Sequence, residues 1–463
     1  MNGLSIIILA AGHGKRMFSD LPKVLHCLAG KPLLAYCFET AQQLNPDAIY
    51  VVYGSGGDRV RDRFSSAHVH WIEQQQLLGT GHAVAQVLPY IQNDQHRILV
   101  LLGDMPLLQA ETLQYLLDHT AFDQLGLVTS NFSLPDGYGR VLRDTNYRVK
   151  AIVEDKDTSD QQKNINEVNS GVLLANVEML KVCLQRLENN NAQAEYYLTD
   201  VIAYAVQQGL MVNTVMATAL EIQGVNDRVQ LANLERAYQR YLAKNFLLAG
   251  VQILDPDRFD LRGELIAARD VVIDINVLIL GKVEIGAGST IGPNTILKDV
   301  VIGSDVNINS FCMIEQALIS DHCIIGPFAR IRPGTALDQE VQIGNFVEIK
   351  NSKIRKRTKI NHLSYIGDAV LGENVNVGAG TITCNYDGQQ KHETVIADHA
   401  FIGSNTALVA PIRIGQGATI GAGSILTRDV DAFSLTLNRA KVRSVKDWSR
   451  SRLKKKKKNT EAS

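Results

Sequence analysis

A glycine-rich loop with two adjacent cations follows the first aliphatic run of the sequence. Residues 9–17 read LAAGHGKRM, so two glycines precede Lys15 and Arg16. Glycines at a strand-to-helix turn let the backbone approach a phosphate, whose charge the N–H groups and basic side chains offset. Met17 replaces the third glycine of a dinucleotide fingerprint, and no Gly-Lys-Ser/Thr follows. We interpret the loop as a phosphate site of another kind, with a plain tight turn as the alternative and Lys23 as a second cation.

A single carboxylate follows a strongly apolar run in the first half. Asp104 comes after ILVLLG and before Met-Pro. A carboxylate at the carboxyl end of a central strand is well placed to hold Mg²⁺ against a nucleotide phosphate; a turn-forming aspartate is the alternative. Asn226, in GVNDR, could give the same ion a neutral oxygen, although its position favours a helix N-cap. This half shows no nucleophile paired with a base, which suits phosphoryl-type transfer by positioning and charge neutralisation.

The second half contains a histidine in a setting that suits general-base catalysis. His362 lies in KINHLSYIGD, and Glu348 lies fourteen residues earlier in GNFVEIK. If a coil of the repeat takes about eighteen residues, the two side chains lie on adjacent coils and could meet. A carboxylate that orients an imidazole is the usual support for a histidine base. The alternative is a surface or stacked histidine. Arg332 and Lys350 are the cations that we assign to a phosphate near it.

Short aliphatic runs alternate with helical patterns through the first half. We expect strands at the following residues: 5–9, 48–53, 96–102, 126–130 and 170–176. Most of these runs are apolar on both faces, which is typical of a parallel sheet covered by helices on both sides. Helical spacing appears at 33–44 and 110–119. The pattern predicts an open, Rossmann-like α/β domain whose ligands lie beyond the carboxyl ends of its strands.

From about residue 250 an aliphatic residue recurs at every sixth position, commonly followed by glycine. The register is unbroken in three stretches: Ile285, Ile291 and Leu297; Ile319, Ile325, Ile331 and Leu337; Ile402, Leu408, Ile414, Ile420 and Leu426. This hexapeptide period indicates a parallel β-helix, with the aliphatic side chains inside and the small residue permitting the corner. Residues 383–395 interrupt the register, and such insertions map to loops that often bind ligands.

These patterns predict two domains joined by a helix. We expect an α/β domain at 1–226, a helical linker at 227–249, a β-helix at 250–437 and a C-terminal segment with a basic tail at 438–463. The linker helix places apolar residues at helical spacing: Leu231, Leu234, Tyr238, Tyr241 and Leu242. We expect this helix to hold the domains apart.

Composition narrows the class of protein and its partners. Of 463 residues, 45% are hydrophobic and 21% charged, which excludes a disordered chain. The N-terminal apolar run is too short for a membrane span and lacks a basic region before it, so we expect no signal peptide and no membrane insertion. Six cysteines without a CxxC pair favour reduced thiols in a cytoplasmic protein.

The net charge of −1 hides a basic tail. Residues 450–458 carry seven basic groups, which leaves −8 on the rest of the chain. Such a run at a chain end is usually a solvated tail, with weak contact to nucleic acid or lipid as the alternative. Because the body is not basic, we expect no nucleic acid as the main partner.

The motifs together resemble a known enzyme family over nearly the whole chain. LAAGHGKRMFSDLPKVL, followed by LGTGHA, LGDMPL and GYGR, resembles the sugar-nucleotide pyrophosphorylases. FARIRPG, GNFVEIK, NHLSYIGD and VGAGTITCNYDG resemble left-handed β-helix acyltransferases. Their order is similar to that of the bifunctional N-acetylglucosamine-1-phosphate uridylyltransferase/glucosamine-1-phosphate acetyltransferases. The resemblance implies acetylation of glucosamine 1-phosphate by acetyl-CoA, then UMP transfer from the co-substrate UTP. UDP-N-acetylglucosamine and pyrophosphate result, and the former supplies cell-envelope polysaccharides such as peptidoglycan and lipopolysaccharide.

The resemblance also assigns the uridylyl site, residue by residue. The residues it places on UTP or UDP-N-acetylglucosamine are Leu9, Ala10, Ala11, Gly12, Lys23, Gln74, Gly79, Thr80, Gly103, Asp104, Gly139, Glu154, Asn169 and Asn226. Within this set, Gly139, Glu154 and Asn169 would hold the sugar, and Asp104 with Asn226 the Mg²⁺. Arg16 would neutralise the triphosphate during in-line attack by the sugar phosphate, and Lys23 joins Arg16 in the catalytic set. Leu102 departs from the aromatic residue often seen before Gly-Asp, which affects a backbone contact only.

The acetyl site is carried over in the same way. Arg332, Lys350, Tyr365 and Asn376 would bind glucosamine 1-phosphate, with His362 as base and Glu348 behind it. Acetyl-CoA would lie against Ala379, Asn385, Tyr386, Ser404, Ala422 and Arg439, although the proline usual near Arg439 is missing. The family forms homotrimers that share this site between subunits, so the insertion at 383–395 could reach a neighbouring chain.

Two other readings compete with the bifunctional enzyme. The first is a pyrophosphorylase whose β-helix serves only oligomerisation or regulation. That reading leaves the joint presence of Arg332, Lys350, His362 and the Asn385-Tyr386 pair without a reason. The second is a non-catalytic scaffold with a basic interaction tail. The intact phosphate loop and Asp104 argue against the scaffold.

Overall fold

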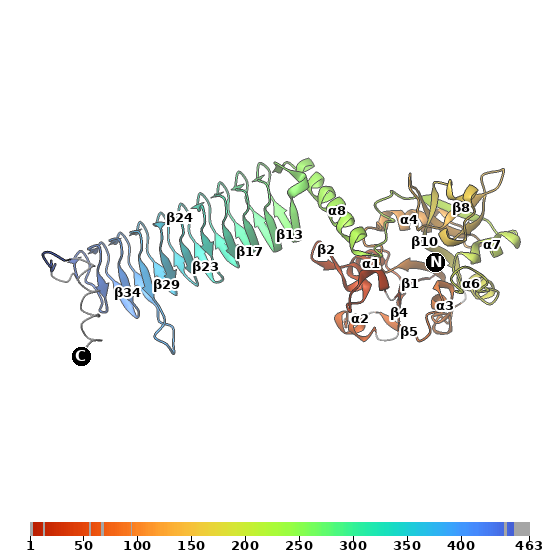
Figure 1. The fold of residues 1–463 in the computed structure, drawn as a ribbon, viewed down its shortest axis with the longest axis horizontal. Coiled ribbons are helices and arrows are strands. Elements are labelled where there is room, and N and C mark those ends of the chain that lie inside the picture. The colour runs from red at the N-terminus through yellow and green to blue at the C-terminus, as the bar shows by residue number, and fades with distance from the viewer. Residues whose placement is uncertain are drawn as a thin grey trace, which may run out of the picture. The chain divides into compact units, whose positions relative to one another are not determined.

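The computed structural model describes residues 3–12, 14–54, 57–65, 69–93, 95–438 and 442–448. Its contacts divide the chain into two compact units, Met1–Leu242 and Ala243–Ser463. Figure 1 labels the helices and strands of both units. Within the described ranges, no helix is both long and apolar enough to cross a membrane.

A nine-stranded sheet forms the centre of unit 1. Its main path runs β11 (Val212–Met216), β7 (Leu125–Asn131), β10 (Glu167–Asn176), β6 (Arg97–Leu102), β1 (Leu4–Ala10), β4 (Ala48–Gly54) and β5 (His70–Gln74). All five predicted strands are present. Strands β1, β4, β5 and β6 are parallel, but β10 is antiparallel to both β6 and β7. The parallel direction predicted for 170–176 is therefore wrong, because burial on both faces does not decide a strand's direction.

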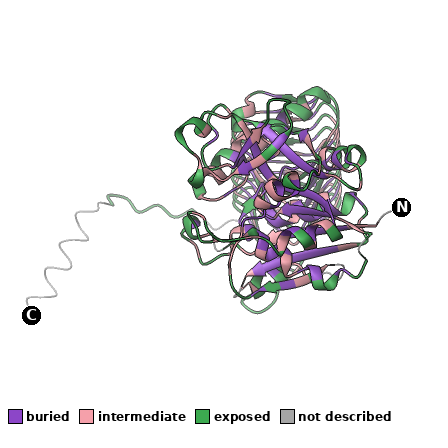
Figure 2. Ribbon diagram, turned by 90° about the vertical axis from the view of Figure 1, so that its right-hand side faces the viewer, coloured by how far each residue is buried: buried purple, intermediate pink, exposed green. Residues whose placement is uncertain are grey.

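Helices cover both faces of this sheet. The helices of unit 1 before its last are α1 (Leu33–Gln43), α2 (Asp58–Arg63), α3 (Thr80–Ala85), α4 (Ala110–His119), α5 (Asp160–Lys163), α6 (Val177–Leu184) and α7 (Asp200–Gln207). Ile6 and Ile8 of β1 pack in the layer of α1 and α4, whereas Ile7 packs in the layer of α3, α6 and α7. Alternate side chains of a strand point to opposite faces, so both faces of the central strands are largely buried, as the purple strands in Figure 2 show.

The predicted linker is helix α8 (Arg228–Leu248). Its first part belongs to unit 1, since Leu234 is fully buried in a cluster with Met17 and Leu33. The carboxylate of Glu235 also accepts the N–H of Ala29 at 2.7 Å. Tyr241, predicted on the apolar face, is exposed.

Unit 2 is a left-handed parallel β-helix. Its strands run from β12 (Gln252–Ile253) to β38 (Leu435–Thr436), and each pairs in parallel with a strand of the next coil, 17 or 18 residues away in most coils. Every aliphatic residue of the predicted hexad register is buried. These side chains form the interior of the prism, as predicted.

Most glycines after the aliphatic positions have a different role from the predicted one, although Gly326 does adopt left-handed backbone, with φ 88°. Gly403 and Gly344 lie where a Cβ would approach the backbone of the next coil to 2.5 and 1.9 Å. They are required for close stacking of coils rather than for turning the corner. Other residues turn the corners, in left-handed backbone, for example Asn405 with φ 55° and Phe346 with φ 56°.

One coil is longer than the others. Asn376 pairs with Phe401, 25 residues later, so this coil holds the predicted insertion. Its residues 385–393, which we call the arm, fold back on themselves through an antiparallel bridge between Tyr386 and Lys391. The arm projects from the stack of coils (Figure 1).

Candidate active sites

A cavity of about 700 Å³ opens at the carboxyl ends of β1 and β6 in unit 1. Parallel neighbouring strands bring these ends to one edge of the sheet. The cavity is lined by the predicted nucleotide residues Leu9, Ala10, Ala11, Gly12, Arg16, Lys23, Gln74, Gly79, Thr80, Asp104 and Asn226. Gly103 supports its floor, since its N–H donates to the carbonyl of Leu9 at 2.9 Å. The structure thus brings together residues from five separate stretches of the sequence.

One glycine and one methionine determine the conformation of the phosphate loop. Gly14 has left-handed backbone, φ 58°, and the N–H of Met17 donates to its carbonyl at 2.8 Å. Met17 is fully buried against Leu28 and Leu33. The residue that excludes a dinucleotide fingerprint is therefore the anchor that fixes this turn.

Three side chains that line the cavity contact one another. Lys23 Nζ donates to Asp104 Oδ2 and, at 3.1 Å, to Asn226 Oδ1. The side chains of Lys23 and Asp104 are 13% and 15% exposed, so solvent screens this pair only weakly. The N-cap of α8 is Asp227, whose Oδ1 accepts from Gln230 N at 2.8 Å. The N-cap role favoured for Asn226 is therefore wrong, and its amide faces the cavity.

A second cavity, of about 270 Å³, adjoins the first and contains the predicted sugar residues Gly139, Glu154 and Asn169. The buried Oδ1 of Asn169 has no hydrogen-bond partner among the described residues. Burial raises the pKa of Glu154, and three nearby aspartates raise it further, while a 2.9 Å hydrogen bond from Thr199 Oγ1 opposes the shift. An unsatisfied amide oxygen and a half-buried carboxyl group are suited to sugar hydroxyl groups.

The two cavities share a wall. Residues that line both are Leu9, Arg16, Thr80, Leu102, Asp104 and Asn226. A nucleotide in one cavity and a sugar phosphate in the other would therefore meet beside Arg16 and Asp104. Sequence reasoning missed further lining residues, among them Tyr138, Thr199 and Glu195. Each lies in a loop whose path depends on tertiary packing.

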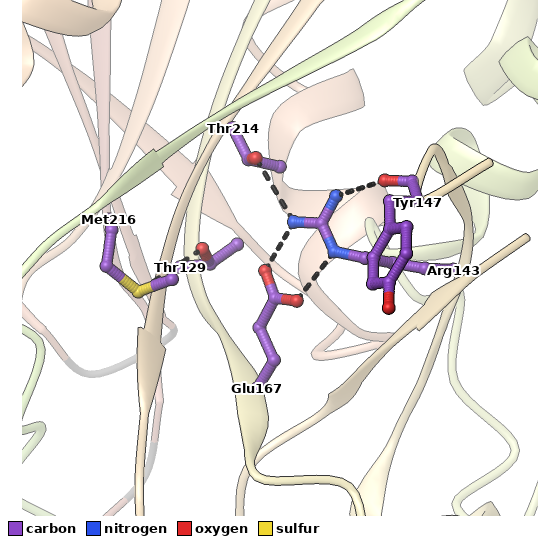
Figure 3. Close-up of polar contacts among 6 residues, drawn as sticks. All are labelled: Thr129, Arg143, Tyr147, Glu167, Thr214 and Met216. Carbon is purple, nitrogen blue, oxygen red and sulfur yellow. Dashed lines mark hydrogen bonds and ion pairs between the residues drawn. The ribbon is translucent and has the colours of Figure 1, made fainter.

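The hairpin of β8 (Arg140–Arg143) and β9 (Val149–Val153) forms one side of the sugar cavity. Arg143 fastens it to the main sheet (Figure 3). Its guanidinium donates to both carboxylate oxygens of Glu167 on β10, at 2.7 and 2.6 Å, and to Thr214 Oγ1 on β11 at 3.2 Å. A further bond reaches the carbonyl of Tyr147, at 2.8 Å. One side chain thus ties the hairpin to two strands.

In unit 2, His362 ends β27 (Lys359–His362) at a corner of the β-helix. Its Nδ1 lies 2.9 Å from Oδ1 of Asn345, which is its register partner on the preceding coil. Glu348 pairs with Tyr365 in register and accepts from Arg332 at 2.8 Å. The predicted contact between Glu348 and His362 is therefore wrong, because residues meet across coils at a spacing of 17, not 14.

The predicted sugar-phosphate residues occupy two different faces of the prism. Lys350, in β25 (Glu348–Lys350), and Tyr365, in β28 (Tyr365–Gly367), lie on neighbouring strands of one sheet. Asn376, in β30 (Asn376–Val377), belongs to the other sheet, which the structure does not join to them by any hydrogen bond it describes. Asn376 instead lies on the strand next to β27, which carries His362.

Sequence reasoning missed Lys391 in the arm. The nearby Lys350 ammonium lowers the pKa of Lys391, and Asp368 partly offsets this. Two ammonium groups held this close favour an anion between them. The signal in the sequence was the lysine inside the insertion, but only folding brings it back to Lys350.

The predicted acetyl-CoA residues follow one corner and the arm. Ala379, Ser404 and Ala422 occupy the same corner on successive coils, where glycine neighbours allow close stacking. Asn385 and Tyr386 begin the arm. Arg439 and the basic tail lie outside the described residues.

Comparisons with known proteins agree with this division. A family model described as MobA-like NTP transferase domain matches residues 6–137, and one described as bacterial transferase hexapeptide (six repeats) matches 393–428. A curated "Bifunctional protein GlmU" of Alkalilimnicola ehrlichii is 52% identical over 96% of both chains. The protein of the same name from Ralstonia nicotianae is 52% identical over 96% of this chain and 98% of its own. That of Nitrosospira multiformis is 51% identical over 99% of this chain and 100% of its own.

Proposed function

This chain belongs to the family of bifunctional GlmU proteins, and from that membership we propose which residues carry each of its reactions. The protein is a bifunctional enzyme: it acetylates glucosamine 1-phosphate with acetyl-CoA, and it transfers UMP from UTP to N-acetylglucosamine 1-phosphate. Its products are UDP-N-acetylglucosamine and pyrophosphate. A non-catalytic β-helix does not fit relatives that are bifunctional over nearly their whole length.

We assign uridylyl transfer to the two adjoining cavities of unit 1. The observation that carries this assignment is their shared wall at Arg16 and Asp104. A phosphate oxygen of the sugar phosphate attacks the α-phosphorus of UTP, and the bond to the β-phosphate breaks to release pyrophosphate. Arg16 and Lys23 neutralise the triphosphate, while Glu154 and Asn169 orient the sugar. Positioning and charge neutralisation are sufficient for this chemistry.

We further propose that Asp104 and Asn226 hold Mg²⁺. The ammonium of Lys23 already lies between their oxygens, which supports a preference for a cation there. Mg²⁺ prefers six oxygen ligands, so two protein oxygens leave room for phosphate and water. When bound, the metal supplies charge neutralisation for the triphosphate. Lys23 would then turn from Asp104 toward the phosphates.

Acetyl transfer is assigned to His362 and the residues around it. If Nδ1–H donates to Asn345 Oδ1, the lone pair of Nε2 is free to take a proton from the ammonium of glucosamine 1-phosphate. The resulting amine attacks the thioester carbonyl, the carbon–sulfur bond breaks, and the departing thiolate takes the second proton. Arg332, Lys350 and Tyr365 bind the sugar phosphate. Glu348 acts by holding Arg332 rather than the imidazole.

We also propose that the enzyme is a homotrimer that shares its acetyl sites between subunits. Asn376 lies on a different sheet from Lys350 and Tyr365, and a neighbouring chain that packs along the corner could contribute to the same site. The arm supplies a second element that could reach a neighbour. Six free cysteines among the described residues favour a reducing, cytoplasmic location. Fractionation of cells and light scattering test these two points.

Separate assays of the two half-reactions on the full-length protein test the assignment. Thiol release is followed with acetyl-CoA and glucosamine 1-phosphate, and pyrophosphate release with UTP and N-acetylglucosamine 1-phosphate. We expect both activities, and Arg332→Ala should weaken only the first. Uridylyl transfer without any acetyl transfer would instead favour a β-helix that serves oligomerisation.

A further inference from the structure

Asp368 lies next to the acetyl site but has no part in the mechanism above. It follows β28 at a corner of the prism, in left-handed backbone with φ 47°. Both oxygens of its carboxylate accept side-chain amides. Oδ1 accepts from Asn351 Nδ2 at 2.6 Å, and Oδ2 accepts from Asn385 Nδ2 at 2.5 Å. One bond thus points back to the stack of coils and the other to the start of the arm.

The backbone of Asp368 holds the residue that follows the other end of the arm. Its carbonyl accepts from Thr394 N at 3.2 Å, and its own N–H donates to Lys350 O at 3.0 Å. The arm is closed between these points, since His392 N donates to Asn385 O at 2.9 Å. Asp368 is therefore joined to both legs of the arm and to the strand that carries Lys350.

Charge reinforces this connection. Burial by itself would raise the pKa of Asp368, but the amides of Asn351 and Asn385 and the charges of Lys350 and Lys391 outweigh burial and lower it. In return, Asp368 counteracts the repulsion between Lys350 and Lys391. The carboxylate stays ionised and keeps the two ammonium groups compatible within one site.

We propose that Asp368 is a positioning residue for acetyl transfer: it fixes both ends of the arm, orients Asn385 and thereby places Lys391 beside Lys350. This inference deepens the proposed function and rests on the acetyl site being where we assign it. Asp368 itself touches no reacting atom. Its effect should therefore appear in substrate affinity more than in the chemical step.

Asp368→Asn in the full-length enzyme tests the proposal. The variant keeps the shape of the side chain but loses the charge and one acceptor. We expect KM for acetyl-CoA or glucosamine 1-phosphate to rise about tenfold or more, with a smaller change in kcat. Uridylyl transfer should stay unchanged. A merely structural role would lower thermal stability and leave the KM values of the folded enzyme unaltered, which would overturn the proposal.

Asp299→Asn is the matched control. Asp299 occupies the same row of corners, with φ 52°, and its Oδ1 accepts a backbone N–H from Lys282 at 3.0 Å. Its contact is with its own coil stack and not with the arm. We expect wild-type KM values. Equal KM changes in both variants would mean that any corner aspartate has this effect, and would contradict a special role for Asp368.

Two further variants complete the test. If Asp368 acts through Asn385, the double variant Asp368→Asn/Asn385→Ala should raise KM no more than the worse single variant. If the KM changes of the two single variants instead multiply in the double variant, Asp368 does not act through Asn385. His362→Ala is assayed in parallel. If His362→Ala keeps its acetyl-transfer turnover, the proposed acetyl site is refuted. If His362→Ala loses turnover but Asp368→Asn keeps wild-type KM values, only the role of Asp368 is refuted.

Discussion

The hydrogen bond between His362 and Asn345 decides which ring nitrogen can act as a base. The amide oxygen of Asn345 can only accept a hydrogen bond, so the contact favours the tautomer of His362 that carries its hydrogen on Nδ1. Nε2 is then the basic atom. Asn345 gives this orientation without a second charge beside the incoming phosphate. A neutral orienting group suits a site that already contains the Arg332–Glu348 pair.

His362→Ala should lower acetyl-transfer turnover by about a hundred- to ten-thousand-fold, the usual range for general-base assistance. Binding of acetyl-CoA should survive, and uridylyl transfer with ready-made N-acetylglucosamine 1-phosphate should not change. Steady-state kinetics of both half-reactions measure this. His322→Ala, at a corner of an earlier coil, is the control and should be silent. Full turnover with weakened substrate affinity would make His362 a binding residue.

Glu154→Gln should stabilise the protein at neutral pH while weakening sugar binding. The folded pKa of Glu154 is raised, mainly by burial, so the folded state holds its proton to higher pH than the unfolded state. Stability therefore falls as pH rises through that window, and the penalty is absent below the ordinary range of a glutamate. The amide removes the penalty and can still accept from Thr199. Thermal melts of both proteins across pH 4 to 8 measure the effect.

The gain from Glu154→Gln should shrink as the pH falls toward the ordinary range. A constant difference across the series would contradict a titration of Glu154.

Glu154 also shows which features of the site the sequence can predict and which it cannot. The motif placed Glu154 at the sugar, but its contact with Thr199 joins residues 45 positions apart. Asn345 was predictable by counting one coil back from His362, had the coil length been known to be 17 there.

At the scale of elements, the hairpin β8–β9 borders the sugar cavity, and the side chain of Arg143 links it to β10 and β11. The hairpin could not be predicted, because its strands are short and turn at an exposed loop. The central strands could be predicted, because aliphatic runs leave few alternatives. The direction of β10 could not, since it depends on a connection through this same hairpin.

Arg143→Met should lower the free energy of unfolding of unit 1 by about 2 kcal/mol and raise KM for the sugar phosphate in uridylyl transfer. The side chains of Arg143 and Glu167 are 25% and 16% exposed, so the variant strands a largely buried carboxylate. Denaturant unfolding and kinetics provide the two measurements. Lys150→Met removes an exposed charge from the same hairpin. It should change the free energy of unfolding and the KM for the sugar phosphate by little. Equal effects of the two substitutions would contradict a specific role of Arg143 in holding the hairpin to the sheet.

At the scale of the whole molecule, the two reactions belong to units that fold around separate cores. The hexad period predicted the β-helix because each coil repeats one burial pattern. The boundary at 226 was harder to predict from the sequence. The pattern of α8 suits a linker helix, although Leu234 and Glu235 are part of unit 1. Its helical pattern does not reveal which unit buries it.

A fragment ending at Leu248 should be monomeric, soluble and able to make UDP-N-acetylglucosamine, because it retains all of α8 and both cavities. A fragment ending at Asn226 should be clearly less stable, since it loses Leu234 from a buried cluster. Light scattering and thermal melts measure both. Trimers of the longer fragment would refute the assignment of oligomerisation to the β-helix.

Asp104→Ala, assayed for both half-reactions in one preparation of the full-length enzyme, tests the central claim most directly. The substitution removes the carboxylate that pairs with Lys23 and that we assign to Mg²⁺, at the wall shared by both cavities of unit 1. Uridylyl transfer should fall by at least about a hundredfold, and acetyl transfer should keep its wild-type rate. Equal loss of both activities, in a protein that remains folded, would contradict two independent sites.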